Sequence, residues 1–293
     1  MASGNGGNGG NGTAGDLRLT SRDMARFVRD GFLRFDGLVP RELCAAAMAE
    51  IESGRHMRDR GQGGAPFRDI WAEPGSALGQ AFRLPRVAAI IHSLVGPDPR
   101  YDHHAAHLTP AHTRKGANLH QDAEYDVRRN HFDIQVSFFP EDTPAESGGT
   151  LFLPGSQFRR VYESTTRRYQ DVLGQVQAVC DAGTMFFWHT NVWHAARSNR
   201  TGRDRYMFKL RLNPTVRQQR LWNTADLDDP DTRTDVAKIL SERIPWHGQR
   251  HRIEVMNRIR LWRYLAGDPD FDVALWWTRI ENTPETVYRT QLA

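Results

Sequence analysis

The sequence predicts a mainly β fold with flanking helices, of the sandwich or barrel type. Many short strand-like segments, separated by Gly/Pro turns, occupy the middle of the 293-residue chain, and this pattern is typical of such folds. Apolar residues at helical spacing precede and follow this region. Hydrophobic residues make up 39% of the chain, which is enough to build a core in one large domain with or without an appended helical part.

The amino-terminal part is expected to begin with disorder and then to form a helix and a strand. Residues 1–15 are a Gly/Asn-rich run that offers nothing to bury, so we expect a disordered tail. Thr20 and Asp23 have the spacing of a capping box and predict a helix start. Gly31 can end that helix, and residues 32–35 are then expected to form a short strand.

Two further helices are predicted before the strand-rich region. Pro40 opens the first, and Cys44 on it is expected to be a small buried side chain. Residues 85–95 form the second. Between them lies a polar, glycine-rich stretch, residues 56–65, which is followed by Trp71. This stretch is interpreted either as a surface loop or as a flap that brings Trp71 near a substrate.

Six segments in the middle of the chain are expected to be strands: 101–109, 132–139, 150–153, 175–180, 185–188 and 206–212. Pro140 and Pro144 lie between two of them, where turns are expected. Two facing sheets of a jelly roll are one arrangement of such strands. The pattern alone does not choose this arrangement over other sandwiches.

The chain changes character after Pro214. Residues 235–243 and 250–265 are expected to be helical, and residues 215–293 hold five of the eight tryptophans: Trp222, Trp246, Trp262, Trp276 and Trp277. We expect this extension to pack against the barrel, with a dimer interface or a lid as alternatives. The predicted organisation is therefore a tail (1–15), a main domain (16–214) and a helical extension (215–293).

Composition limits the classes of partner. The net charge of +4 comes mostly from scattered arginines, and no basic block or recognition motif points to nucleic acid. No apolar run approaches the ~20 residues needed to cross a bilayer, and no secretory signal is evident. With only Cys44 and Cys180, a disulfide framework is not expected. These features favour a cytoplasmic protein, monomeric or homodimeric, that acts on a small molecule and binds neither nucleic acid nor membrane.

His120, Asp122 and His194 are candidate metal ligands. Side chains of a strand alternate between its faces, so a His-x-Asp pair at a strand end can turn both side chains toward one ion. The distant histidine must then come from another strand. Two imidazoles and one carboxylate that leave the opposite face open are the ligand set of non-haem Fe(II) oxygenases. A three-ligand zinc hydrolase is the competing interpretation.

The segments around these ligands resemble the phytanoyl-CoA dioxygenase family of Fe(II)/2-oxoglutarate-dependent oxygenases. The resemblance includes residues 146–157 (ESGGTLFLPGSQ) and 199–205 (NRTGRDR), and it runs from about Leu19 to Pro214. It implies a double-stranded β-helix, which is a cupin-like jelly roll. It also implies Fe(II), 2-oxoglutarate as cosubstrate, and O2.

The resemblance further assigns Arg205, eleven residues beyond the distal histidine, to the far carboxylate of 2-oxoglutarate. The planar fork of a guanidinium matches a carboxylate with two hydrogen bonds. Arg203 and Arg200 are close enough in sequence to be alternatives. Relatives often carry a hydroxyl residue two positions after the distal histidine. This chain has Ala196 there, so that hydrogen bond is missing or supplied elsewhere, for example by Ser198.

Two histidines upstream occupy positions where relatives carry amides at the cosubstrate site. These are His107 and His103, which alternation places on one strand face. Most other histidines, including His104, are expected to be packing or surface residues, with His189 as the main exception because it lies just before the distal ligand. The candidates for substrate contact combine aromatic surface with hydrogen-bonding groups: Trp71, Tyr125, Asp126 and Gln135.

The predicted function is hydroxylation, or another oxidative tailoring step, at an unactivated C–H bond of a small molecule. The family's reaction releases succinate and CO2, and its breadth suggests secondary metabolism. Desaturation, ring closure and epimerisation stay open. The alternatives are a non-catalytic relative that binds a metabolite, and a demethylase of a macromolecular substrate.

Overall fold

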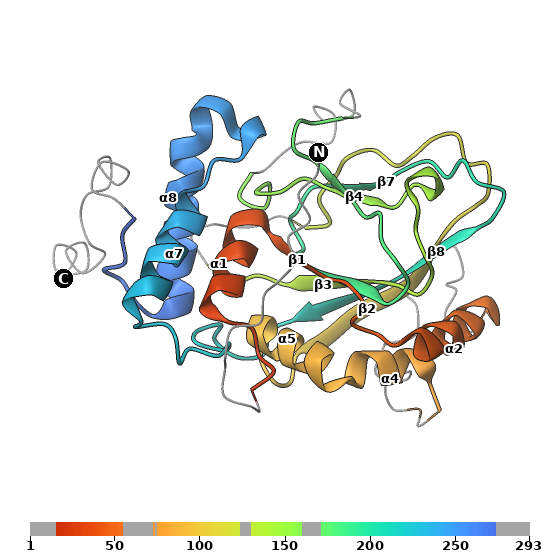
Figure 1. The fold of residues 1–293 in the computed structure, drawn as a ribbon, viewed down its shortest axis with the longest axis horizontal. Coiled ribbons are helices and arrows are strands. Elements are labelled where there is room, and N and C mark those ends of the chain that lie inside the picture. Colours follow the sequence, from red (N-terminus) through yellow and green to blue (C-terminus); the bar gives the residue numbers. More distant parts are fainter. Residues whose placement is uncertain (1–15, 55–72, 74, 124–129, 160–170, 274–293) are drawn as a thin grey trace.

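Two antiparallel β-sheets form the centre of the protein (Figure 1). The computed structural model describes residues 16–54, 73, 75–123, 130–159 and 171–273. A five-stranded sheet has the order β1-β6-β3-β8-β2, and a three-stranded sheet has the order β5-β4-β7. The strands are β1 (Phe32–Phe35), β2 (Arg100–Thr109), β3 (Ile134–Phe139), β4 (Thr150–Phe152), β5 (Val176–Gln177), β6 (Thr184–His189), β7 (His194–Ala196) and β8 (Arg205–Asn213).

The two sheets face one another across an apolar layer. Phe186 and Trp188 of the five-stranded sheet pack with Phe152 of the three-stranded sheet. The rings of Phe152 and Phe186 are stacked, with centroids 5.0 Å apart. This arrangement confirms the predicted jelly-roll core with helices around it.

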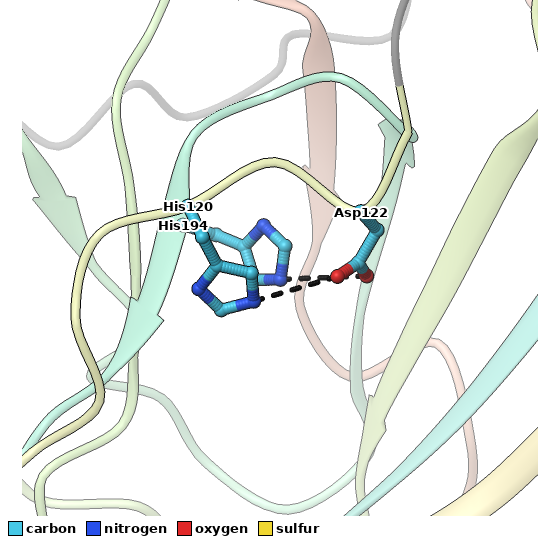
Figure 2. Close-up of side chains that lie close together, drawn as sticks. All are labelled: His120, Asp122 and His194. Carbon is cyan, nitrogen blue, oxygen red and sulfur yellow. Dashed lines mark ion pairs between the residues drawn. The ribbon is translucent and has the colours of Figure 1, made fainter. Parts of the chain in front are cut away.

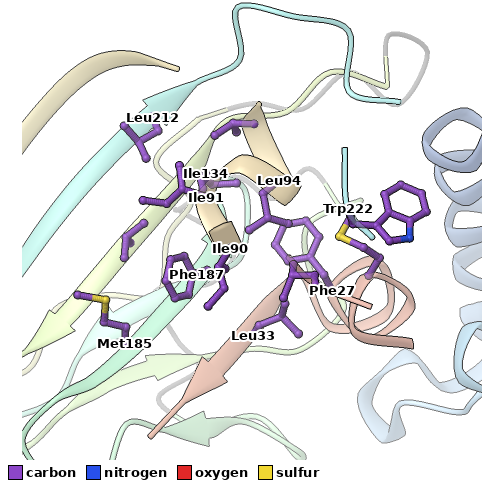
Figure 3. Packing of buried hydrophobic residues seen from close by; sticks show 14 of the residues in the cluster. Phe27, Leu33, Ile90, Ile91, Leu94, Ile134, Met185, Phe187, Leu212 and Trp222 are labelled. Carbon is purple, nitrogen blue, oxygen red and sulfur yellow. The ribbon is translucent and has the colours of Figure 1, made fainter. Parts of the chain in front are cut away.

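Helices cover the outer face of the five-stranded sheet and one end of the molecule (Figure 1). They are α1 (Ser21–Asp30), α2 (Arg41–Glu52), α4 (Ala77–Arg83), α5 (Pro85–Val95), α7 (Pro230–Ser241) and α8 (His251–Ala266), with 3-10 turns η1 (Ala145–Ser147) and η2 (Pro245–Arg250). Alternate residues of β3, β6 and β8 point outward into this helical layer and form the main core. Figure 3 shows Ile90 of α5 beside Phe187 of β6 in that core, and Phe27 of α1 belongs to the same cluster.

Several local predictions are confirmed. Thr20 and Asp23 form the capping box of α1, and Gly31 ends the helix in the left-handed conformation, with φ of 81°. The predicted strand at residues 32–35 and the predicted helix at 85–95 have the predicted bounds. Cys44 and Cys180 are both buried and unpaired with one another, in agreement with the absence of a disulfide framework.

Two predicted elements need different bounds, and two further elements were not predicted. The strand predicted at 175–180 is interrupted after β5, where the Val179 N–H bonds the Gln177 carbonyl, and Cys180 then pairs with Thr143 in a separate bridge. Helix α7 begins five residues earlier than predicted, at Pro230, because Asp229 caps it by accepting from the Thr232 N–H. Helix α4 and strand β7 were not predicted. Each is short, with seven residues in α4 and three in β7, and the Ser76 hydroxyl caps α4 by accepting from the Gly79 N–H.

The C-terminal extension packs on α1 at the end of the barrel (Figure 1). Trp222 and Trp262 are almost fully buried, and their ring centroids lie 5.7 Å apart. The extension and the barrel therefore share one apolar core. Trp276 and Trp277 lie outside the described residues, and the division at residue 214 stays a prediction. In the described part of the chain, no helix has both the length and the apolar character needed to span a bilayer.

Candidate active site

The chain brings His120 and His194 side by side through a short backbone pairing. The His120 N–H donates to the His194 carbonyl at 3.1 Å, and the His194 N–H donates back at 2.9 Å. Their ring centroids are consequently only 4.3 Å apart. Asp122 follows in a bend after His120, and its carboxylate turns toward both rings (Figure 2). We call His120, Asp122 and His194 the triad.

The triad has the spacing of a metal-ligand set. The Nε2 atom of His120 lies 3.4 Å from Asp122 Oδ1, and the Nε2 atom of His194 lies 3.5 Å from Asp122 Oδ2 (Figure 2). One ligand atom from each residue lies within 4.8 Å of the other two. Three side chains from two distant segments thus present one oxygen and two nitrogens to a common point.

The backbone fixes which ring nitrogen each histidine offers. Nδ1 of His120 lies 2.8 Å from the Asn118 carbonyl, and Nδ1 of His194 lies 3.0 Å from the Val192 carbonyl. A carbonyl can only accept, so each Nδ1 carries a proton and Nε2 is left with its lone pair. Hydrogen bonds of this kind orient metal-binding histidines and set their tautomer. The two rings therefore suit a divalent metal such as Fe(II).

Asp122 is held by two groups that lie outside the triad and on other strands. The Gln135 amide donates to Asp122 Oδ2 at 2.6 Å, and the Lys209 ammonium lies 2.9 Å from the same oxygen. Burial alone would raise the pKa of Asp122. The interactions with His120 and His194 and the nearby positive charge of Lys209 outweigh burial and keep that pKa well below its ordinary range. Asp122 is thus an anion fixed in place for a metal.

The two histidines of the triad differ in their electrostatic surroundings. The interaction with Asp122 raises the pKa of His120 above its usual 6.5. Burial lowers the pKa of His194 to about 4, although Asp122 opposes that shift. The Trp188 ring lies against His194, with centroids 4.5 Å apart. His194 is therefore neutral at physiological pH and already in the form that binds a metal.

Arg205 lies at the start of β8 with its guanidinium buried and incompletely paired. Only 5% of the residue is exposed, and one Nη donates to the Thr109 hydroxyl. Its Nε and other Nη have no hydrogen-bond partner among the described residues. Burial lowers the pKa of Arg205 to about 10, so the group stays charged at neutral pH. A buried cation with idle donors is a site for an anion.

Strand register puts Arg205 and the triad at two ends of one interior surface. Thr109 is opposite Arg205 across β2 and β8, and His107 is opposite Met207, the next residue inward. Burial lowers the pKa of His107 to about 3, with a further contribution from Lys209. Its side chain is nonetheless exposed, the combination expected for a residue that lines an open interior space. His107 therefore lies between the triad and Arg205.

The structure separates the predicted arginines. Arg200 and Arg203 are exposed, and 85% of the Arg203 side chain is accessible. Arg205 alone among the three is buried on the inner face. The hydroxyl that contacts it belongs to Thr109, which sequence reasoning did not single out. The sequence could have indicated Thr109, because it lies two residues beyond His107 on the same predicted strand and therefore faces the same side.

Lys209 was also missed. It is four residues beyond Arg205 on β8, so alternation puts both on the same face. Only 12% of its side chain is accessible. The available signal was its position, because a basic residue two strand alternations beyond Arg205 faces the same interior surface.

The predicted substrate contacts are only partly described. Trp71, Tyr125 and Asp126 lie outside the described residues. Gln135 is fully buried and donates to Asp122, so its visible role is to support a triad member.

The two remaining histidine predictions have different outcomes. The backbone of His103 pairs with Arg211 next to a β-bulge, and its side chain is outside the described part. His189 is fully buried and stacks on Phe132. Burial lowers its pKa to about 3. His189 therefore packs against Phe132 of the main core and does not belong to the triad.

Gly148 and Gly149 allow β4 to approach the segment that follows His194. A Cβ on Gly148 would lie 2.1 Å from the Ser198 carbonyl oxygen, and one on Gly149 would lie 2.0 Å from that of Ala178. Gly148 also has φ of 73°, which favours glycine. The Gly-Gly pair therefore lets the backbone of the three-stranded sheet close around the site.

A hollow of about 610 Å³ lies beside the Arg205 end, between α2 and the loops before β4 and β8. Its lining includes Arg205, Cys44 and Glu141 but no member of the triad. The hollow therefore borders Arg205 but does not reach the triad.

Comparison with known proteins identifies the family. The sequence profile described as "Phytanoyl-CoA dioxygenase (PhyH)" matches residues 27–207. HygX from Streptomyces hygroscopicus, with nickel and 2-oxoglutarate bound, superposes with a TM-score of 0.54 at 16% identity, covering 73% of this chain and 94% of that one. EctD from S. alaskensis, with 2-oxoglutarate and 5-hydroxyectoine, gives a TM-score of 0.52 at 16% identity, covering 70% and 79%.

The epimerase SnoN, in complex with Fe3+, alpha ketoglutarate and nogalamycin RO, gives a TM-score of 0.52 at 20% identity, covering 66% of this chain and 83% of that one. At these identities, the three structures show a common fold. A search of curated protein sequences found no match. The profile match covers more than half of the sequence, and the chain belongs to the phytanoyl-CoA dioxygenase family of Fe(II)/2-oxoglutarate-dependent oxygenases.

Proposed function

We propose that this oxygenase hydroxylates, or otherwise oxidatively tailors, an unactivated C–H bond of a small molecule in secondary metabolism, with release of succinate and CO2. The observation that carries the proposal is the pairing of the triad with a buried, incompletely paired Arg205 on one interior surface. A zinc hydrolase has no use for that arginine. A passive binding module has little need of both parts together.

His120, Asp122 and His194 would hold the ferrous ion in this proposal. Hydrogen bonds from Nδ1 orient the two histidines, and Gln135 and Lys209 hold the Asp122 carboxylate. The ligand atoms are therefore oriented before the metal binds. Preorganisation of this kind removes an ordering cost from binding. When bound, the ferrous ion together with 2-oxoglutarate and O2 supplies the oxidant that cleaves the C–H bond.

Arg205, Thr109 and His107 would hold the cosubstrate. The idle N–H groups of Arg205 match the far carboxylate of 2-oxoglutarate, and the Thr109 hydroxyl steadies the guanidinium. The neutral imidazole of His107 lies between this carboxylate site and the triad. Behind the triad, the apolar wall formed by Trp188, Phe186 and Phe152 keeps water from that side.

The structures of relatives support a small-molecule substrate. EctD was solved with 5-hydroxyectoine and SnoN with nogalamycin RO. Because SnoN is described as an epimerase, epimerisation is the second candidate outcome at the same site. Mass analysis separates the two, because hydroxylation adds one oxygen atom and epimerisation leaves the mass unchanged.

The test is succinate formation from 2-oxoglutarate by protein loaded with Fe(II) under O2. The wild-type protein should form succinate, and a small molecule that is the substrate should accelerate it. His120→Ala should abolish it, whereas His131→Ala, at an exposed position, should leave it unchanged. Binding of 2-oxoglutarate with no succinate from the wild-type protein would favour the non-catalytic alternative. Acceleration by peptides or oligonucleotides instead of metabolites would favour the demethylase.

A further inference from the structure

Both metal-binding segments are tied to one backbone carbonyl. Gln121 stands between the first two members of the triad, and its amide donates to the Arg159 carbonyl at 2.7 Å. Trp193 directly precedes the third member, and its indole N–H donates to the same carbonyl at 3.2 Å. The Gln121 amide also donates to the Asn191 carbonyl at 2.9 Å. The position of Arg159 therefore bears on all three ligands at once.

The Arg159 side chain is in turn held by the C-terminal extension. Its Nε donates to Oε1 of Glu254 on α8 at 2.5 Å, and Glu254 is only 3% exposed. The guanidinium also lies over the Trp246 ring, 4.3 Å from its centroid, in cation–π geometry. Trp246 donates to the Pro154 carbonyl at 2.8 Å and packs on Trp193, with centroids 5.6 Å apart.

This arrangement lies partly beyond the family profile. The profile match ends at residue 207, so Glu254 and Trp246 belong to the additional C-terminal part. Two features distinguish their contacts from general packing. The Glu254–Arg159 pair is a buried ion pair, and its loss would leave an uncompensated charge. The Arg159 carbonyl also accepts two side-chain donors, both from residues adjacent to metal ligands.

We propose that the C-terminal extension positions the metal centre, acting from Glu254 and Trp246 through Arg159 to Gln121 and Trp193. The inference rests on the proposed metal site and adds a determinant of its affinity. Glu254 and Arg159 are positioning residues, because neither touches the ligands. Loss of their contact frees the two donors that fix the triad segments. Outer-shell changes of this kind typically weaken metal binding roughly 10- to 100-fold.

The experiment compares two variants in the extension by Co(II) titration of the metal-free protein. Glu254→Gln keeps the shape of the side chain but removes its charge. Leu240→Ala, in α7, removes a fully buried side chain and destabilises the extension without touching Arg159. Each protein is followed by its unfolding midpoint, its Co(II) dissociation constant and the visible spectrum of bound Co(II), well below its unfolding temperature.

We expect Glu254→Gln to raise the Co(II) dissociation constant about 10- to 100-fold and to alter the spectrum. Leu240→Ala should lower the unfolding midpoint and leave both metal readouts at their wild-type values. If Glu254→Gln does not fold, Trp246→Phe replaces it, with a smaller shift in the same direction. Wild-type affinity and spectrum in the folded variant, or equal weakening by Leu240→Ala, would overturn the inference alone. A wild-type protein that binds no Co(II) would overturn the proposed metal site as well.

Discussion

The two ends of the barrel interior are built on opposite plans. At the triad end, the protein itself satisfies the hydrogen-bonding groups that orient the ligands. Backbone carbonyls accept from both Nδ1 atoms, and Gln135 and Lys209 hold the carboxylate. At the other end, Arg205 has two N–H-bearing nitrogens without a partner among the described residues. In the proposed function, the ligand atoms of the triad are thus oriented by the protein itself, whereas the Arg205 end would be completed by the far carboxylate of 2-oxoglutarate.

This difference has a physical reason. A metal needs fixed donors at short range, so its affinity is higher when the ligands are oriented before the ion binds. A dicarboxylate must enter and its product must leave in every cycle. A buried guanidinium that waits for an anion binds strongly without adding a competing internal carboxylate. The two ends should therefore respond differently to mutation and to pH.

Removal of the positive charge of Arg205 should have the largest effect on the kinetics. Arg205→Gln deletes charge-assisted hydrogen bonds worth roughly 1.5–3 kcal/mol each, so the KM for 2-oxoglutarate should rise by about 100-fold or more. The dissociation constant for the metal alone should not change. Steady-state kinetics and metal titration check the two parts.

The matched control is Arg203→Gln, two residues away and exposed, which should leave both constants unchanged. An unchanged KM in Arg205→Gln would mean that the carboxylate is held elsewhere. A weakened metal site in the same variant would show that the two ends are not independent.

A smaller effect is expected from a change at the triad end, next to Asp122. Gln135→Leu removes the amide that holds Asp122 and should raise the dissociation constant for Fe(II) by roughly 10- to 100-fold. The affinity of Arg205 for the far carboxylate is untouched, so KM for 2-oxoglutarate measured at saturating Fe(II) should stay near its wild-type value. A variant with a normal metal affinity and a raised KM would instead assign Gln135 to the cosubstrate.

The mildest separation of the two ends is by pH. Because the pKa of His120 is raised above 6.5, the metal must displace a proton from it as pH falls through that pKa. His194, with a pKa of about 4, stays neutral, and Asp122 stays ionised. Metal affinity should therefore fall about tenfold per pH unit below that pKa, following one proton. Calorimetric titration between pH 8 and about 5.5 measures this slope.

Arg205, with a pKa of about 10, keeps its charge throughout that range. Its contribution to 2-oxoglutarate binding should be the same at each pH when the metal is saturating. A fall in metal affinity of about a hundredfold per pH unit would correspond to two displaced protons and would mean that His194 also titrates. A flat slope would place His120 outside the ligand set.

Sequence reasoning reached the parts of this protein that depend on local chemistry or on linked motifs. Thr20 and Asp23 predict a helix start because their side chains form hydrogen bonds with the neighbouring backbone. The triad and Arg205 were found together because their order and spacing resemble a known family. The same resemblance placed His107 and His103 at the cosubstrate site, and alternation put the two on one strand face.

Features set by contacts between distant segments were not predicted. Lys209 reaches Asp122 only because β8 lies beside β3 and faces the loop after His120. Glu254 meets Arg159 across 95 residues of sequence. Strand β7 has three residues and exists because β4 and the His120 segment pair with it. No local period encodes such contacts.

The most direct test of the account is a crystal structure of the protein with Fe(II) and 2-oxoglutarate, prepared without O2. We expect one metal ion bound by Nε2 of His120, Nε2 of His194 and the Asp122 carboxylate. We also expect the far carboxylate of 2-oxoglutarate to form two hydrogen bonds with Arg205. A metal held by other residues, or a cosubstrate whose far carboxylate lies away from Arg205, would contradict the account.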